Sequence, residues 1–169
     1  MAGFLFLDVD GVLNGRHTRD RVLGCPGISD RKVRLLSWIL QRTGARLVLT
    51  SSWKDQWETV VRGGRDPFGE RLQEAFSSAS VRVFGVTRDA GRDRGTGIRA
   101  FLKEQGEAAP FAVLDDTVFP DFAAQGILPH LVRTKSSLGL TFWDALRAVR
   151  ILTREEAGAA GQRRTDWKS

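Results

Sequence analysis

The chain alternates short apolar runs with longer segments in which apolar residues recur every three to four positions. The longer segments predict helices over residues 30–43, 53–61 and 96–105 and from Thr141 onward. Strands that alternate with helices of this length favour an α/β fold, a doubly wound parallel sheet covered on both faces. The short runs predict its buried strands, at residues 3–7, 46–49, 81–86, 111–114 and 130–132.

Two of the predicted helices carry clear end signals. Gly44 follows the segment from Asp30 to Thr43 and is typical of a helix C-terminus. Thr141 and Asp144 have the spacing of a capping box at the start of the last helix. The apolar faces expected to pack inward are Val33, Leu36, Ile39 and Leu40 in the first of these helices, and Phe142, Ala145, Leu146, Val149 and Leu152 in the last.

With 169 residues, the chain is long enough for one ordinary domain, which we expect to span residues 1–157. From Ala157 the composition turns to Gly, Ala, Gln and Arg without periodicity, which predicts a flexible basic tail at residues 158–169. No apolar stretch approaches the roughly 20 residues that cross a bilayer, and the N-terminus does not resemble a cleavable leader. We therefore expect a soluble, cytoplasmic protein with no membrane association.

The cysteine content excludes two kinds of site, and the net charge leaves the class of partner open. Cys25 is the only cysteine, so the chain can form neither an internal disulfide framework nor a thiolate zinc cluster. Lys and Arg number 26 against 20 Asp and Glu, a net charge of +6. This excess is as compatible with a polyanionic partner as with a solvated basic surface that binds nothing in particular.

The most informative segment, residues 4–14, reads Phe-Leu-Phe-Leu-Asp-Val-Asp-Gly-Val-Leu-Asn. Asp8 and Asp10 follow a buried strand, where unpaired carboxylates are costly unless a metal, a cation or water compensates them. At the end of a strand, Asp8 could attack phosphorus and form an aspartyl-phosphate. Asp10 is then the candidate general acid and base. Gly11 allows a sharp turn and is expected to leave backbone amides free for phosphate oxygens.

A second polar segment follows the strand at residues 46–49. Thr50 is the candidate phosphate-binding hydroxyl, and Ser51 is expected to bind the substrate beside it, where a helix N-terminus offers free amides and a positive dipole. On its own, this polar segment is also compatible with a simple helix N-cap.

A second acidic pair, Asp115 and Asp116, ends the apolar run at residues 111–114. Parallel strands expose their carboxyl ends at one edge of a sheet, so both acidic pairs are expected to meet there. Oxygen ligands of this kind suit Mg²⁺. We expect Asp8 and Asp115 as direct ligands, the main-chain carbonyl of Asp10 as a third, and Asp116 in a supporting contact.

A cation is also needed beside the crowded carboxylates and the phosphoryl group. Arg94, just before the helix predicted at 96–105, is the leading candidate, for substrate binding as well as catalysis. Arg88 and Arg92 in the same charged stretch are competitors, because any one of these side chains could equally belong to a solvated loop.

Taken in order, these residues resemble the motifs of haloacid dehalogenase (HAD) superfamily phosphatases. Those motifs are Asp-x-Asp, then Thr or Ser, then Lys or Arg, then an acidic pair. Here they are Asp8 with Asp10, Thr50, Arg94, and Asp115 with Asp116. The resemblance covers about residues 3–152 and implies a HAD-like Rossmann-type fold and a Mg²⁺-dependent phosphatase.

Two further segments resemble the HAD domain of Swiss Army Knife RNA repair proteins. They are Leu-Val-Leu-Thr-Ser-Ser-Trp at residues 47–53 and Leu-Val-Arg-Thr-Lys-Ser-Ser-Leu-Gly-Leu-Thr at residues 131–141. The resemblance implies a phosphatase that acts on RNA or DNA ends, with chemistry similar to that of polynucleotide 3′-phosphatases.

The insertion at residues 14–29 is short, which predicts a minimal cap or none and a crevice open enough for a polymer end. Arg16 and His17 could contact substrate from this insertion, whereas the spacing of Trp53 with Trp57 favours a core position over base stacking. Two other functions remain open: a small-metabolite phosphatase, and a non-catalytic nucleic-acid-binding module whose acidic pairs hold a structural ion.

Overall fold

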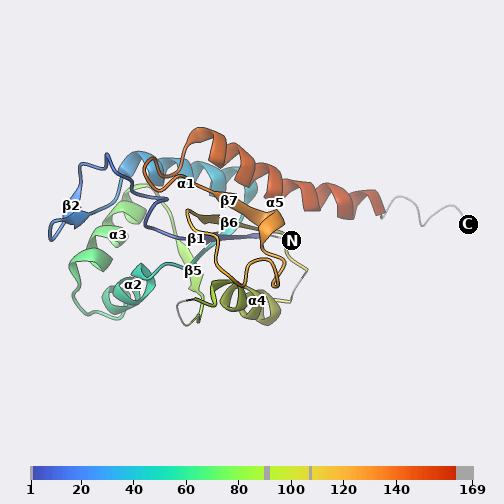
Figure 1. Ribbon diagram of the computed structural model, residues 1–169, viewed down its shortest axis with the longest axis horizontal. Coiled ribbons are helices and arrows are strands. Elements are labelled where there is room, and N and C mark those ends of the chain that lie inside the picture. The colour runs from blue at the N-terminus through green and yellow to red at the C-terminus, as the bar shows by residue number, and fades with distance from the viewer. Residues whose placement is uncertain (1, 90–91, 107, 163–169) are drawn as a thin grey trace, which may run out of the picture.

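A computed structural model describes residues 2–89, 92–106 and 108–162 of the protein. Its centre is a parallel five-stranded sheet in the order β5-β4-β1-β6-β7 (Figure 1). This architecture confirms the α/β fold and the parallel sheet expected from the sequence. The strands are β1 (Phe4–Leu7), β4 (Arg46–Leu49), β5 (Val83–Val86), β6 (Phe111–Asp115) and β7 (Leu131–Arg133).

Helices cover both faces of the sheet. In Figure 1, α1 and α5 lie along one face and α4 lies against the opposite face. Two further helices, α2 and α3, follow β4 and pack against each other. The helices are α1 (Asp30–Thr43), α2 (Trp53–Val61), α3 (Pro67–Ser78), α4 (Arg94–Glu104) and α5 (Phe142–Gln162).

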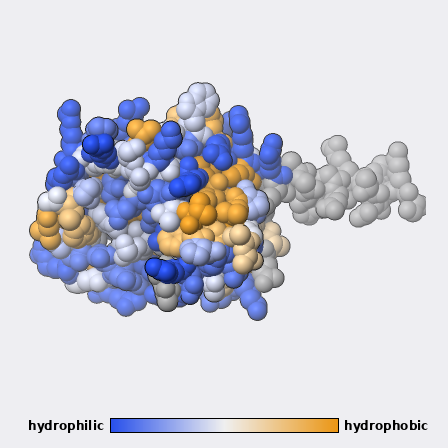
Figure 2. Space-filling view, viewed as in Figure 1, coloured by the Kyte–Doolittle hydropathy of each residue, from blue (hydrophilic) through white to orange (hydrophobic). Residues whose placement is uncertain are grey.

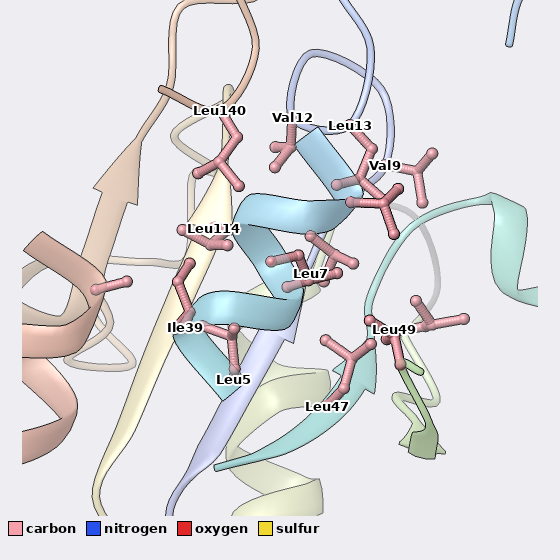
Figure 3. Close-up of a cluster of buried hydrophobic side chains, with 14 of the residues drawn as sticks. Leu5, Leu7, Val9, Val12, Leu13, Ile39, Leu47, Leu49, Leu114 and Leu140 are labelled. Atoms are coloured by element: carbon pink, nitrogen blue, oxygen red, sulfur yellow. The ribbon is translucent and has the colours of Figure 1, made fainter. Parts of the chain in front are cut away.

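The two faces divide the core into two clusters, because successive side chains of a strand point to opposite sides. Leu5 and Leu7 of β1 join the cluster beneath α1 and α5, and Figure 3 shows them beside Ile39 of α1. Phe4 and Phe6 join the cluster beneath α4. All four side chains of β1 are buried, as a central parallel strand requires.

The helix end signals operate as expected. Gly44 ends α1 with φ +66° and donates its N–H to the Leu40 carbonyl. Thr141 and Asp144 form the reciprocal hydrogen bonds of a capping box at α5. One residue of the expected apolar face differs: Phe142 is 52% exposed and contacts Trp38 at a ring distance of 5.8 Å.

Among the elements that the sequence pattern did not predict are a hairpin and a helix near the candidate site. A hairpin of β2 (Arg21–Val22) and β3 (Cys25–Pro26) occupies the first insertion, and its two-residue strands are too short to show an alternating pattern. Helix α3 begins at an N-cap, Asp66, which accepts hydrogen bonds from Phe68 and Gly69. Arg71 of α3 binds Asp20 at 2.8 Å and so fixes the hairpin to the domain.

Some boundaries also differ from the expected ones. Helix α4 begins at Arg94 rather than Thr96, and β5 begins at Val83 rather than Val81. Helix α5 continues to Gln162, so the first part of the expected tail at 158–169 is helical. Residues 163–169 lie outside the described residues.

The described part of the chain contains no helix with the length and apolar character needed to span a membrane. Most of the surface in Figure 2 is hydrophilic, with a hydrophobic patch over the region of β7 and a smaller one at the end of the molecule where β2 lies. Val118 and Leu128, from the segment that precedes β7, are among the exposed apolar side chains.

Burial of α1 against the sheet makes a testable contribution to stability. Leu36 is fully buried, so Leu36→Ala leaves a cavity and lowers the free energy of unfolding by about 2–4 kcal/mol. Urea denaturation measures the change. Arg42→Ala, at an exposed position of the same helix, is the control and costs less than about 0.5 kcal/mol. Equal costs for the two variants would contradict this account of the core.

Candidate active site

The register of the sheet brings the three polar strand ends together. Leu7 pairs with Leu49 of β4 on one side and with Leu114 of β6 on the other. The next residue of each strand is therefore at the same level: Asp8, Thr50 and Asp115. The backbone continues this pairing, because Asp8 donates its N–H to Leu114 and Thr50 donates its N–H to Leu7.

Three carboxylates form a compact cluster at this edge. Asp8, Asp115 and Asp116 each place one oxygen within 4.8 Å of the others. Asp116 can approach so closely because Gly11 lacks a side chain: a Cβ there would lie 2.2 Å from Asp116 Oδ2, and Gly11 has φ +70°. Gly11 is thus required both for the turn and for the position of an acidic group.

Arg94 is the cation at this cluster. Its Nη1 lies 2.5 Å from Asp115 Oδ2 and 3.3 Å from Asp8 Oδ1. The guanidinium also packs over the ring of Phe119, at 4.3 Å from the centroid. Asp121 accepts hydrogen bonds from the N–H groups of Gly95 and Thr96, which anchors the start of α4 and with it Arg94.

The two competing arginines lie elsewhere. Arg88 forms an exposed ion pair with Glu58 at 2.9 Å, and Arg92 is exposed. Of the three candidates, the structure brings only Arg94 to the carboxylates. The sequence could not separate them because it did not reveal that α4 begins at Arg94.

The pKa shifts at the carboxylate cluster indicate an excess of negative charge there. Burial raises the pKa of Asp8 to about 7, and the charge of Asp115 acts in the same direction while Arg94 opposes it. Burial also raises the pKa of Asp115. Burial alone would lower the pKa of Arg94, but Asp115 and Asp8 outweigh it and the pKa lies above its ordinary value. One arginine therefore does not balance the carboxylates, and the all-oxygen donor set fits a hard divalent cation.

Thr50 and Ser51 border the cluster from β4. The Thr50 side chain is buried, and its Oγ1 has no hydrogen-bond partner among the described residues. Arg94 Nε is likewise buried without a partner in the described part of the chain. Buried polar groups are nearly always paired, so these two atoms indicate a missing polar ligand. Ser51 is fully buried and interacts with Asp8.

The N-cap alternative for this segment does not account for Thr50. Helix α2 has Ser52 at its N-cap position, and Ser52 forms no side-chain capping bond. The nearest substitute is Ser51, whose Oγ accepts the N–H of Trp53 at 3.3 Å. The Thr50 hydroxyl takes no part in capping.

Asp10 is exposed and held by two donors. Asn14 Nδ2 donates to one carboxylate oxygen at 2.8 Å, and Trp53 Nε1 donates to the other at 3.0 Å. Trp53 is buried, as its spacing with Trp57 predicted, but its indole N–H also serves the site. The sequence reasoning missed the roles of both donors. Asn14 could have been found, because it lies four residues after Asp10 in the same motif.

Gly11 itself uses its backbone groups within the loop. Its amide is not free for phosphate, because it donates to Asn14 Oδ1 at 2.8 Å. The carbonyl of Gly11 accepts a hydrogen bond from the Thr134 hydroxyl. Gly11 lines the cleft, but its backbone groups maintain the loop itself.

A cleft of about 730 Å³ opens beside Asp10 and Asp116, and Asp8, Asp115, Thr50 and Arg94 are not among its lining residues. Asp10, Asp116 and Arg16 are among its lining residues, together with Pro26 of the hairpin and Ser136. His17 is exposed and is not part of the lining. The hairpin thus borders the cleft at one side, and the cleft remains open.

A buried ion pair braces the loop that leads to Arg94. Lys54 Nζ in α2 lies 2.6 Å from Asp89 Oδ1, and Thr87 donates to the same oxygen. Gly97 of α4 contacts Asp89 closely, since a Cβ there would lie 2.7 Å from Asp89 Cβ. These contacts connect the start of α2, beside Thr50, to the start of α4. No local pattern in the chain indicated this pair, because its two residues are 35 positions apart.

Comparison with known families agrees with this geometry. The family model for the HAD domain in Swiss Army Knife RNA repair proteins matches residues 4–145, which is 142 of 169 residues. The chain therefore belongs to this HAD family, which supports a hydrolase of the phosphatase type. No curated protein matches the chain.

The raised pKa of Asp8 makes a prediction for the protein without metal. The protonated form is favoured in the folded state, so this group destabilises the fold as pH rises from about 4 through about 7. At about pH 8 with chelator, Asp8→Asn is more stable than wild type by about 1–3 kcal/mol, and the difference shrinks at about pH 5. Urea denaturation at both pH values measures it.

A control variant and a measurement with added Mg²⁺ make this experiment specific. Asp55→Asn removes an exposed carboxylate of α2 and shows no such gain. Mg²⁺ stabilises wild type against unfolding more than it stabilises Asp8→Asn. A wild-type protein that is more stable than Asp8→Asn in chelator at about pH 8 would refute the charge excess.

Proposed function

We propose that the protein is a Mg²⁺-dependent phosphomonoesterase that forms a phospho-aspartate on Asp8 and acts on the phosphate end of a nucleic acid or nucleotide. The observation that carries the proposal is the grouping of Asp8 with Arg94 and the acidic pair, beside a Thr50 hydroxyl that has no partner among the described residues. A phosphoryl group at this position would satisfy the buried donors that the protein leaves unpaired.

In the first step, a carboxylate oxygen of Asp8 attacks phosphorus and the bond from phosphorus to the leaving oxygen breaks. Asp10 donates its proton to that oxygen, so the product leaves as an alcohol. Asn14 and Trp53 orient the Asp10 carboxyl for this transfer. Thr50 and Arg94 hold the phosphoryl oxygens through the hydroxyl and Nε, which have no other partner among the described residues.

In the second step, Asp10 takes a proton from water, and the resulting nucleophile attacks the phosphorus of phospho-Asp8. The bond between the Asp8 oxygen and phosphorus breaks, which regenerates the carboxylate and releases inorganic phosphate. The same residue acts first as acid and then as base, because the proton that it gave away returns from water. The open cleft beside Asp10 gives water access.

The site residues fit Mg²⁺ by charge and donor type. Asp8 and Asp115 would hold the ion directly with the main-chain carbonyl of Asp10, and Asp116 would support it. When bound, the ion would supply positive charge that keeps Asp8 ionised and offsets the charge of the phosphoryl oxygens.

The nucleic-acid part of the proposal has separate support. The matched family takes its description from RNA repair proteins. The cleft is open, borders Arg16 and is not covered by a large cap, so a polymer end could enter. The net charge of +6 is compatible with a polyanionic substrate.

A substrate panel tests this proposal. With Mg²⁺, the protein releases phosphate from a 3′-phosphorylated oligonucleotide at a kcat/KM at least about tenfold higher than from mononucleotides or sugar phosphates. Chelator abolishes the release, and Asp8→Asn lowers kcat by at least about a thousandfold because no phosphoryl acceptor remains. A 5′-phosphorylated oligonucleotide in the same panel reports which end is preferred.

Each rival function gives a different result. A small-metabolite phosphatase prefers sugar phosphates or mononucleotides at equal concentration. A non-catalytic binding module releases no phosphate from any substrate, and Asp8→Asn leaves its nucleic-acid affinity unchanged.

The hydrogen bond from Trp53 to Asp10 makes a finer prediction. Trp53→Phe removes one donor from the acid and base, so kcat falls about tenfold while KM changes less than about twofold. Steady-state kinetics on the best panel substrate measure both values. Trp57→Phe is a matched control, because Trp57 Nε1 in the same helix donates to Gln73 instead. Equal losses in the two variants would show that Trp53 acts only through folding.

A further inference from the structure

A second cavity, larger than the cleft, lies outside the candidate active site. Its volume is about 760 Å³, and it lies between the first half of α1 and the segment that leads into α5. We call it the α1–α5 groove. No residue of the acidic cluster lines it, and the chemistry proposed above makes no use of it. Its principal lining residues are Arg31, Lys32, Arg34, Trp38, Leu138 and Phe142.

The α1–α5 groove is basic. Arg31, Lys32 and Arg34 line it, and within the described part of the chain none of the three forms an ion pair. Asp30 is adjacent in sequence but binds Arg71 at 2.9 Å. Burial and the charge of Arg31 lower the pKa of Lys32. Anionic groups placed here would relieve this repulsion.

The same groove presents aromatic surface. Phe142 is 52% exposed at the start of α5, and its ring lies 5.8 Å from that of Trp38 in α1. Trp143, directly after it, is 73% exposed but does not line the groove. The exposed Phe142 ring leaves a large apolar surface in water beside three cations. A ligand that is both flat and anionic would cover this ring and neutralise the cations. Bases joined by phosphates have these two properties.

One loop separates the groove from the cleft. Ser136 and Ser137 line the cleft, whereas Leu138 lines the groove. This loop is held against the site, because Arg16 donates its N–H to the Ser137 carbonyl.

Gly139 lies between a residue that lines the cleft and one that lines the groove. With φ +67°, it packs so tightly that a Cβ would lie 2.5 Å both from the Asn14 carbonyl oxygen and from Lys32 Cε. Asn14 lines the cleft and holds Asp10, and Lys32 lines the groove, so Gly139 packs against the walls of both cavities.

From this arrangement we infer that the α1–α5 groove binds single-stranded RNA, with phosphates against Arg31, Lys32 and Arg34 and a base against Phe142. The inference deepens the proposed function and rests on it in one respect: the strand continues over the 136–139 loop and delivers its phosphorylated end to the cleft. RNA is chosen over an acidic protein segment because the exposed rings suit bases, and because the matched family is described by RNA repair.

Binding can be tested without any catalytic step. The probe is a fluorescent, unphosphorylated single-stranded RNA of about 12 nucleotides, and its anisotropy gives the affinity for the full chain. Arg31→Glu with Arg34→Glu, both at exposed positions, weakens binding at least about tenfold. The dependence of log affinity on log salt becomes shallower by about 1.4, the value for two lost phosphate contacts. Phe142→Ala weakens binding about tenfold and leaves the salt dependence unchanged.

The matched control is Arg42→Glu with Arg150→Glu. It changes the net charge by the same amount at exposed positions of α1 and α5 that do not line the groove. Its affinity for the RNA stays within about threefold of wild type. Equal loss in both double variants, or no binding by wild type, overturns the inference. A loss with Phe142→Ala and none with the groove arginines also overturns it, because that pattern indicates an apolar protein partner.

Kinetics separate this inference from the proposed function. The groove variant raises KM for the 3′-phosphorylated RNA and leaves kcat/KM for a 3′-phosphorylated mononucleotide unchanged, because the mononucleotide does not reach the groove. If wild type binds the RNA through the groove and hydrolyses no phosphate end, the proposed function fails and the binding surface stands. If hydrolysis of the RNA is normal in the groove variant, the proposed function stands and the inference fails.

Discussion

Repulsion among carboxylates at the end of a buried sheet is the constraint on which the rest of the site depends. Asp8 and Asp115 follow neighbouring central strands, are buried, and have raised pKa values because water cannot solvate their charge. Such a cluster persists only where positive charge is supplied nearby. The fold supplies part of it through Arg94, and the remaining deficit is what a divalent cation would offset.

The surrounding structure holds Arg94 in place despite this crowding. Asp121 anchors the first amides of α4, and Phe119 packs against the guanidinium. On the other side, Lys54 and Asp89 tie the start of α2, beside Thr50, to the loop before α4. The site is therefore assembled from rigid elements, which keeps the donors around Asp8 preorganised rather than dependent on ligand binding.

Much of the fold followed from periodicity, because strands with period two and helices with period 3.6 leave local traces in the chain. The order of the elements, the Gly44 stop and the Thr141 capping box agree with the structure. The hairpin at Arg21–Pro26 was not found because two-residue strands carry no period. The start of α4 was misplaced because charged residues surround it, and this error left the identity of the active-site cation open.

The sequence alone determined that two acidic pairs and a threonine follow buried strands, since a strand end is a local feature. Only the tertiary structure decided which side chains meet there. The choice of Arg94, the Trp53 hydrogen bond to Asp10 across 43 positions of sequence, and the closeness of cleft and groove at Gly139 all depend on it. The physical reason is that strand register and helix packing set distances between segments, whereas periodicity records only which face of one segment is buried.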